Sequence, residues 1–174
     1  LAFPLSKKVK FGLGYQPYSS KGYDIINTVD ETEDLKRANR FLGKGTVSTV
    51  QSAISYHINE SFSLGFRTNF YFGNITDQQE ISYTNAELVN GFETTNKIKA
   101  FNFTGGTVYQ KKFKNDRKLT VGATYTFGTT GNMETRYVNS TYYYLTEEDK
   151  YNVNIIEELK SEDKNLFPQE VSVG

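Results

Sequence analysis

The sequence predicts an all-β protein, an antiparallel transmembrane β-barrel with long extracellular loops, and three observations lead to this fold class. Apolar and polar residues alternate along most of the 174-residue chain, which is the period of a β-strand with two unlike faces. The apolar positions are unusually aromatic, because the chain contains 13 Tyr and 13 Phe but no Trp. Short and long connections alternate along the chain, which places the short turns at one end of the sheet and the long loops at the other.

Composition excludes several other classes of protein. Lys and Arg total 20, as do Asp and Glu, so the chain lacks the basic excess of a nucleic-acid-binding protein. Cys is absent and His57 is the single histidine, which excludes a disulfide scaffold and metal sites built from thiolates or several histidines. No window of 18 apolar residues is present, so no transmembrane helix is predicted. The low mean hydropathy of −0.58 is compatible with a barrel, in which every second residue faces a wet interior.

About five full strands and a stub at each end are expected from the alternation. The full strands are expected over residues 9–16, 46–58, 62–73, 100–110 and 119–128. Tight turns containing Pro, Ser, Asn or Asp are expected at 4–7, 59–61 and 114–117. Residues 1–174 are interpreted as part of a single β-barrel domain without an internal boundary, and the stubs at Leu1 and Gly174 as points where a larger barrel is cut.

One face of the expected strands is apolar and is predicted to meet lipid. The segment from Phe62 to Phe72 is the clearest, because no charge lies on its apolar face, where Arg or Lys at the bilayer midplane would cost about 2–4 kcal/mol. The predicted membrane-facing residues are Phe11, Leu13, Phe62, Leu64, Phe66, Phe70, Phe72, Phe101, Phe103, Leu119, Val121, Tyr125 and Phe127. The lengths also suit a tilted transmembrane strand, which needs about 9–11 residues.

The other face carries glycines and polar residues and is predicted to line the lumen. The ligand or lumen candidates are Gln51, His57, Arg67, Asn69, Tyr71 and Asn102. Arg67 is expected to form a luminal ion pair or to meet a carboxylate ligand. His57 shares a face with Ser55 but has no evident acid partner, so a nucleophilic site is not expected. Because the sequence contains no catalytic dyad, phosphate-binding glycine loop or metal cluster, we expect neither an enzyme nor a cofactor.

Three long segments, 19–45, 74–96 and 129–165, are predicted as extracellular loops, with local helix at 32–42 and 146–160. Most of the acidic residues lie in them, including Glu147 and Glu148. The run from Asp30 to Asp34 is expected to be solvated, with a divalent cation as the alternative. The residues from Tyr142 to Tyr144 are expected to pack on their own loop, with ligand capture as the alternative.

A soluble antiparallel sandwich or barrel is the alternative fold, because its core would show the same alternation. Three features favour the membrane barrel instead: the inner face is small and polar, the connection lengths are segregated, and the apolar face is aromatic. The corresponding location is the bacterial outer membrane, crossed several times, with outer-membrane lipid as a partner.

Short blocks along the chain resemble the long-chain fatty acid transporter family of outer-membrane proteins, in the forms found in Bacteroidetes. The similar blocks are Ala2–Ser6, Phe11–Ser20, Ser61–Gly65, Asn69–Ile75 and Leu166–Gly174. The resemblance implies a fourteen-stranded barrel with an N-terminal plug and a lateral opening. It also implies passive uptake of hydrophobic small molecules such as long-chain fatty acids. It transfers no ligand-binding residue to this chain.

The sequence is therefore compatible with three functions. The first is passive uptake of a hydrophobic small-molecule ligand. The second is an accessory or structural outer-membrane barrel that binds another outer-membrane protein, since some relatives of the transporter family serve secretion systems. The third is a soluble β-rich binding protein.

Overall fold

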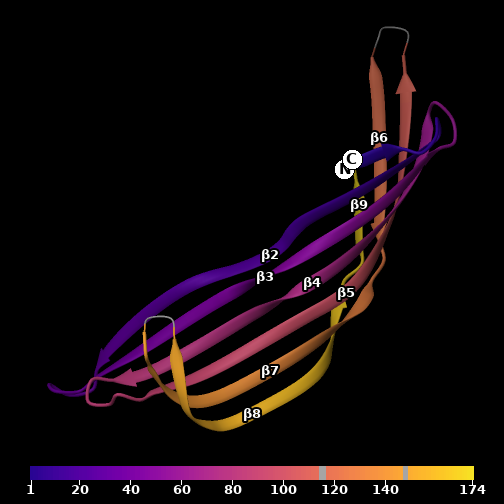
Figure 1. The fold of residues 1–174 in the computed structure, drawn as a ribbon. Helices are drawn as coiled ribbons and strands as arrows, with labels where there is room; N and C mark the ends of the chain where they lie inside the picture. Colours follow the sequence, from indigo (N-terminus) through magenta and orange to yellow (C-terminus); the bar gives the residue numbers. More distant parts are fainter. Residues whose placement is uncertain (114–116, 147–148) are drawn as a thin grey trace.

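A computed structural model of the chain describes residues 1–113, 117–146 and 149–174. It forms one antiparallel sheet of nine strands (Figure 1). The strands are β1 (Ala2–Pro4), β2 (Val9–Asp30), β3 (Lys36–His57), β4 (Phe62–Tyr83), β5 (Val89–Lys112), β6 (Lys118–Thr126), β7 (Thr129–Tyr144), β8 (Lys150–Phe167) and β9 (Glu170–Val173). The all-β antiparallel class predicted from the alternation is therefore confirmed.

Neighbouring strands follow chain order, but the sheet forks along β5. The C-terminal half of β5 pairs with β6 and its N-terminal half pairs with β7. Likewise, β8 pairs with β7 and β9 with β6. Only Phe127 and Gly128 separate β6 from β7, and Pro168, which has no N–H to donate to a ladder, lies between β8 and β9. Each pair of short strands therefore continues as one long, bent strand.

The predicted long loops and their local helices are wrong. Residues 19–45, 74–96 and 129–165 mostly extend the hairpins, and strand replaces the helix expected within 32–42 and 146–160. Backbone N–H and C=O groups can be hydrogen-bonded within a helix or between strands. In these segments they are bonded between neighbouring strands of the sheet. The sequence did not show this because polar residues occur on both faces of the extensions and the apolar ones are scattered among them, so the two-residue alternation that marks a half-buried strand is weak.

The turns at the opposite end agree better with the prediction. The turn after β1 is closed by Leu5 N–H donating to the Val9 carbonyl at 3.0 Å. In the turn before β4, the Asn59 side chain accepts from the Phe62 N–H at 2.8 Å. The predicted turn at 114–117 lies largely outside the described residues, as do Glu147 and Glu148.

The sheet is twisted and curled but remains open. A cavity of about 440 Å³ is lined both by Ala2 of β1 and by Thr124 of β6, so strands far apart in the sheet face the same space. Within the described residues, no pairing joins the β1–β2 side to the β8–β9 side, so closure into a barrel is not observed. None of the described segments is a helix long and apolar enough to cross a membrane.

Candidate functional site: two unlike faces and the Glu80 cluster

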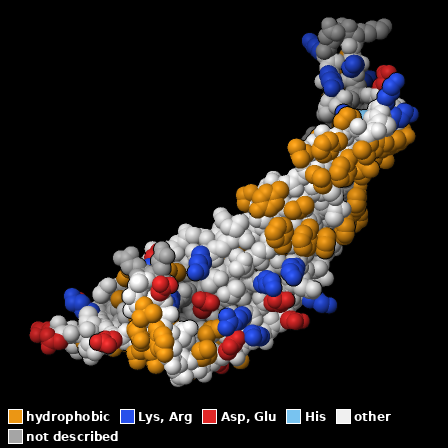
Figure 2. All heavy atoms as spheres, in the orientation of Figure 1, with side chains coloured by type: hydrophobic (Ala, Val, Ile, Leu, Met, Phe, Trp, Pro, Cys, Tyr) orange, Lys and Arg blue, Asp and Glu red, His pale blue; other side chains and the backbone are white. Residues whose placement is uncertain are grey.

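One face of the sheet carries an exposed band of apolar side chains near the short turns, which we call the apolar belt (Figure 2). The register aligns Phe11 of β2, Ile54 of β3 and Phe66 of β4 in one row, and residues in one row share a face. Phe66 is 46% exposed and Phe101 53%. Such a large exposed apolar surface is typical of an interaction with lipid or protein.

The register places the predicted membrane-facing residues together on this belt face, with Phe127 following β6 directly. Their rings contact one another along the belt. Phe70 and Phe101 lie 4.7 Å apart between ring centroids, and Tyr125 and Phe127 lie 4.9 Å apart. That this face meets lipid stays a prediction.

The opposite face is lined by small and polar residues. Gly12, Ala53, Arg67 and Thr104 form one row across β2 to β5, and all four line the 440 Å³ cavity. Small side chains leave room inside the curl, because a Cβ added at Gly65 would meet its nearest atom only at 3.8 Å. The polar face is therefore the concave one where the sheet encloses the cavity.

The predicted lumen residues are brought together in part. Gln51, Asn69 and Asn102 are aligned in one row of the concave face, and Asn69 and Asn102 are 3% and 5% exposed. Arg67 lies in the next row. His57 lies apart, at the end of β3, where its Nδ1 is 2.6 Å from the Ser63 hydroxyl.

Tyr71 belongs to an aromatic bridge that the sequence did not reveal. The register between β2 and β3 shifts between Pro17 and Ser19, so Tyr18 lies in a bulge. The Tyr18 ring lies 4.7 Å from the Tyr71 ring between centroids. On its other side, Tyr71 stacks on Phe167 at 5.3 Å. Rings from β2, β4 and the end of β8 thus meet across the concave face. Only the bulge and the curl bring them together, so no local sequence pattern marks them.

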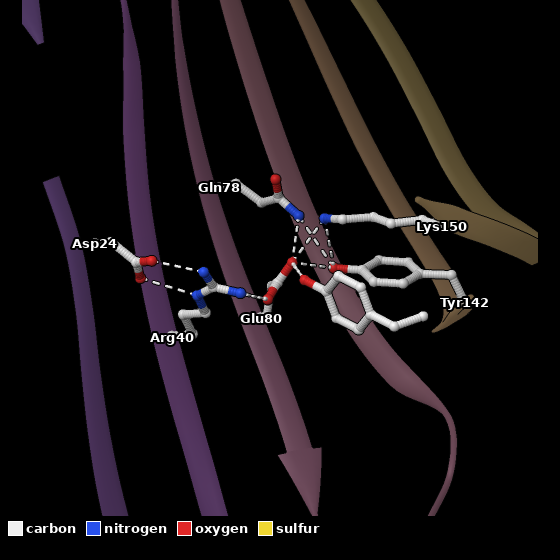
Figure 3. Close-up of polar contacts among 7 residues, drawn as sticks. Asp24, Arg40, Gln78, Glu80, Tyr142 and Lys150 are labelled. Carbon is white, nitrogen blue, oxygen red and sulfur yellow. Dashed lines mark hydrogen bonds and ion pairs between the residues drawn. The ribbon is translucent and has the colours of Figure 1, made fainter. Parts of the chain in front are cut away.

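Beyond the belt, a buried carboxylate gathers polar groups from several strands (Figure 3). The Glu80 side chain on β4 is 5% exposed. Its Oε1 accepts hydrogen bonds from the hydroxyls of Tyr142 at 2.6 Å and Tyr144 at 2.5 Å on β7, and from Lys150 Nζ on β8 at 2.7 Å. The Gln78 amide donates to the same oxygen at 2.7 Å.

Arg40 of β3 extends this Glu80 cluster to the other side. Its guanidinium lies 3.7 Å from Glu80 Oε2 and donates to both carboxylate oxygens of Asp24 on β2, at 2.8 and 2.5 Å. Strands from β2 to β8 are thereby linked through one carboxylate. A buried carboxylate without such partners would be costly.

The cluster fixes the charge states of its members. Burial raises the pKa of Glu80, but hydrogen bonds from Lys150, Tyr142 and Tyr144 outweigh burial, and the net shift is downward. Burial and then the bond to Glu80 raise the pKa of Tyr142 and raise that of Tyr144 to about 12. At neutral pH, Glu80 is therefore a carboxylate and both tyrosines are neutral donors.

The rings of two tyrosines, Tyr142 and Tyr23, each lie across the neighbouring strand at a glycine. The Tyr142 ring lies over Gly91, where any Cβ would collide with it, and reaches Glu80 one strand further. On the concave face, Tyr23 crosses Gly43 in the same way and donates to Asp77 at 2.8 Å, which also accepts from Lys21 at 2.7 Å. The sequence contains these Tyr, Gly and acid residues far apart, so only the register reveals the arrangement.

Two candidates remain, the tyrosine run that begins at Tyr142 and the acidic run that begins at Asp30, and their described residues make contacts within the sheet and its turns. Tyr142 is 3% exposed, so it packs, although on β4 and β5 rather than within a loop. Asp30 and Glu31 form ion pairs with Lys36 at 3.5 Å and Arg37 at 3.1 Å across the turn. Within the part of the chain that the structure describes, no group of three His, Cys, Asp or Glu could hold a metal ion.

The fold and its two faces define an antiparallel β-sheet protein. One face carries an exposed aromatic belt, and the other is lined by small and polar residues. Residues 1–174 match the BamG family model, and the chain belongs to the BamG family, a family of the BAM complex of outer-membrane protein assembly. The family indicates an outer-membrane-associated accessory protein. No curated protein matches the chain. No solved structure matches it either.

The resemblance to long-chain fatty acid transporters is therefore wrong, because the family that matches the whole chain is a different one. The blocks that carried the resemblance, such as Ser61–Gly65 and Asn69–Ile75, lie within or beside β4. They consist of aromatic alternation with glycines, which outward-facing aromatic strands of any barrel share. Such blocks indicate a kind of strand and do not identify a family.

Proposed function

We propose that the chain forms part of the wall of an outer-membrane β-barrel, which acts as an accessory, non-catalytic component of outer-membrane protein assembly. In this role it contacts other proteins of the assembly machinery and does not take up hydrophobic molecules. Membership of the BamG family over residues 1–174 is the observation that carries the assembly role. The apolar belt supports the position in the membrane.

The width of the belt fits an outer membrane. In β4 it extends from Phe62 to Phe72, about 10 residue steps of roughly 3.3 Å, or about 33 Å along the strand. A strand tilt of about 40° reduces this to about 25 Å, the height of the apolar band of outer-membrane barrels. Charged residues begin at its outermost row, where Lys99 pairs with Phe72, and continue in the next row, where Lys97 pairs with Asn74.

The edges of the sheet support closure into a barrel. β1 pairs with the outer edge of β2 only from Lys10 to Gly12, so the rest of that edge of β2 and the outer edge of β8 have no partner strand among the described residues. Unpaired backbone groups are expensive in a bilayer, and closed barrels remove them. Additional strands are therefore expected to join these two edges.

An accessory role fits the chemistry of the polar groups. Glu80 is saturated by donors from its own sheet, and Asp77 is held by Lys21 and Tyr23. A general acid, base or nucleophile needs an accessible group with a matched pKa, whereas these groups hold strands together. We therefore assign them to structure and the exposed surfaces to partners.

The test combines membrane integration with complex formation in the native bacterium. The full-length protein is expected to remain in outer membranes after alkaline carbonate extraction and to migrate differently on gels before and after heating. It is also expected to co-purify with the assembly machinery, and its depletion to lower the amounts of other barrel proteins. Carbonate release would overturn the barrel proposal, and normal barrel levels without co-purification would overturn the assembly role.

A further inference from the structure

The outermost row of the belt, which contains Phe72, carries lysines on the neighbouring strands of the same face. The register aligns Phe72 of β4 with Lys99 of β5, Lys99 with Asn132 of β7, and Asn132 with Lys164 of β8. Residues in one row of a ladder share a face, so these three polar residues lie on the belt face. All three side chains are exposed.

Among the described residues, the two lysines in this row form no ion pair, although the next row of the same face contains two acids, Glu134 and Glu162, and one lysine, Lys97. Further from the belt, Lys97 pairs with Glu134 at 3.5 Å, and Glu158 lies 2.9 Å from Arg136 and 3.2 Å from Lys160. In contrast, no ion pair of Lys99 or Lys164 is found within residues 1–113, 117–146 and 149–174. Blue and red side chains follow the orange belt in this part of the sheet (Figure 2).

The spacing suits a single anionic group. Adjacent strands lie about 4.8 Å apart, so Lys99 and Lys164, two strands apart, have backbones about 10 Å apart. Flexible lysine stems allow both ammonium groups to approach a group between them. Asn132, on the strand between the lysines, supplies an amide donor in the same row.

The other side of this row is apolar. Phe72 lies in the same row, and its ring is 5.5 Å from that of Phe70, which in turn contacts Phe101 at 4.7 Å. A ligand on this surface therefore meets two cations and an amide at one end and stacked phenylalanines at the other. This combination matches a lipid that carries phosphate.

We propose that Lys99, Asn132 and Lys164 bind the phosphate group of an outer-membrane lipid, whose acyl chains lie on Phe70, Phe72 and Phe101. Phosphate oxygens accept charge-assisted hydrogen bonds from both ammonium groups. The inference rests on the proposed function, because it requires the belt face to lie in the bilayer.

The test compares lipid binding to the full-length protein in detergent micelles by native mass spectrometry. The probes are lipid A with two phosphates and the same lipid after enzymatic removal of both. The wild-type protein is expected to prefer the phosphorylated lipid, and Lys99→Gln combined with Lys164→Gln to reduce this preference about tenfold or more. The control, Lys111→Gln with Lys118→Gln, removes two exposed lysines near the short turns, Lys111 on the belt face and Lys118 on the opposite face, and is expected to retain the preference.

Each outcome bears on a different part of the proposal. An unchanged preference in the Lys99/Lys164 variant, or an equal loss in the control, overturns the site. Competition by millimolar inorganic phosphate as effective as that by lipid A also overturns it, because the acyl chains would then contribute nothing. If the variant loses assembly proteins but keeps its lipid preference, the row binds an acidic protein surface instead. Carbonate extraction of the same variants reports separately on the proposed membrane position.

Discussion

At the scale of single residues, Glu80 is a structural carboxylate that connects three other strands to β4. Its partners are Arg40 of β3, Tyr142 and Tyr144 of β7 and Lys150 of β8. Removing one side of a buried ion pair leaves the other without compensation. The stability of the far half of the sheet is therefore expected to depend on this group.

Glu80→Ala is expected to destabilise the protein by about 3 kcal/mol, because Lys150 loses its carboxylate and two tyrosine hydroxyls lose their acceptor. Glu80→Gln keeps an acceptor oxygen and is expected to cost less. Urea unfolding of the full-length protein in detergent, followed by gel mobility, measures both. Glu87→Gln in the exposed turn before β5 is the control, and an equal effect of Glu87→Gln and Glu80→Ala would contradict the structural role.

Stability is also expected to depend on pH at both extremes. The pKa of Glu80 is lowered in the folded state, so its contribution is complete above its ordinary value of 4.5 and is lost as pH falls below it. The pKa of Tyr144 is raised to about 12, so its contribution is complete below pH 10 and is lost as pH rises toward 12.

Unfolding midpoints measured from pH 3 to pH 12 test these two limbs. Glu80→Gln is expected to flatten the acid limb, to which Asp24 and Asp77 also contribute through their lowered pKa values. Tyr144→Phe is expected to flatten the alkaline limb. An alkaline limb that is unchanged in Tyr144→Phe would show that this tyrosine does not titrate as argued.

Gly91→Ala is expected to destabilise the protein by about 1–3 kcal/mol, the usual cost of overpacking. The new Cβ would collide with the Tyr142 ring, and the ring would have to leave Glu80. Gly105→Ala on the same strand is the control, since a Cβ there meets nothing within 4 Å. Comparable unfolding midpoints for the two variants would refute the crossing of Gly91 by Tyr142.

At the scale of elements, each long strand joins two environments. In β4, the first half carries Phe62 to Phe72 of the belt, and the second half carries Asp77 and Glu80 in polar clusters on opposite faces. The same strand thus changes from an apolar outer face to charged clusters without a break in its ladder. If the belt faces lipid, this part of the sheet is expected to tolerate a charged substitution on the concave face but not on the belt face.

Phe66→Lys is expected to reduce folding into lipid vesicles by about 2–4 kcal/mol, the cost of a cation on the lipid face near the midplane. Ser55→Lys is the control, because Ser55 lines the cavity on the concave face. The folded fraction after dilution from urea into vesicles provides the measurement. If Ser55→Lys costs as much as Phe66→Lys, the belt does not face lipid.

At the scale of the whole molecule, the open edges of the sheet are its main liability. β8 exposes Ile155 and Leu159 at 52% and 56%, and no strand pairs with its outer side among the described residues. Unpaired edges with apolar side chains promote edge-to-edge association. In the proposed barrel, the strand that covers β8 is expected to supply both backbone partners and apolar contacts.

Residues 1–174 produced alone in detergent are expected to self-associate, and Ile155→Lys is expected to reduce this association because charge protects an edge. Light scattering after size-exclusion chromatography gives the mass. Leu88→Lys is the control, since Leu88 is 46% exposed but lies in a turn. Equal effects of the two substitutions would mean that general solubility, not the edge, decides the association.

The sequence predicted the parts of this fold that depend on local alternation. The strands around Phe11, Ile54, Phe66 and Tyr125 were recognisable because large apolar groups alternate with small or polar ones. For segments 19–45 and 129–165 the sequence predicts loops, because polar residues occur on both faces there. The aromatic blocks that resemble a fatty acid transporter reflect the composition of aromatic β-strands, which unrelated families share, and the chain belongs to the BamG family.

By itself, the sequence determined the antiparallel strands near the short turns and the difference between their two faces, because side chains on a strand alternate with a fixed period of two. Only the tertiary structure decided the long hairpins, the Tyr18–Tyr71–Phe167 bridge, the Glu80 cluster and the Lys99–Asn132–Lys164 row. These depend on register, bulges and curl, which align residues from strands distant in the chain. Register is a property of paired strands, so no single segment contains it.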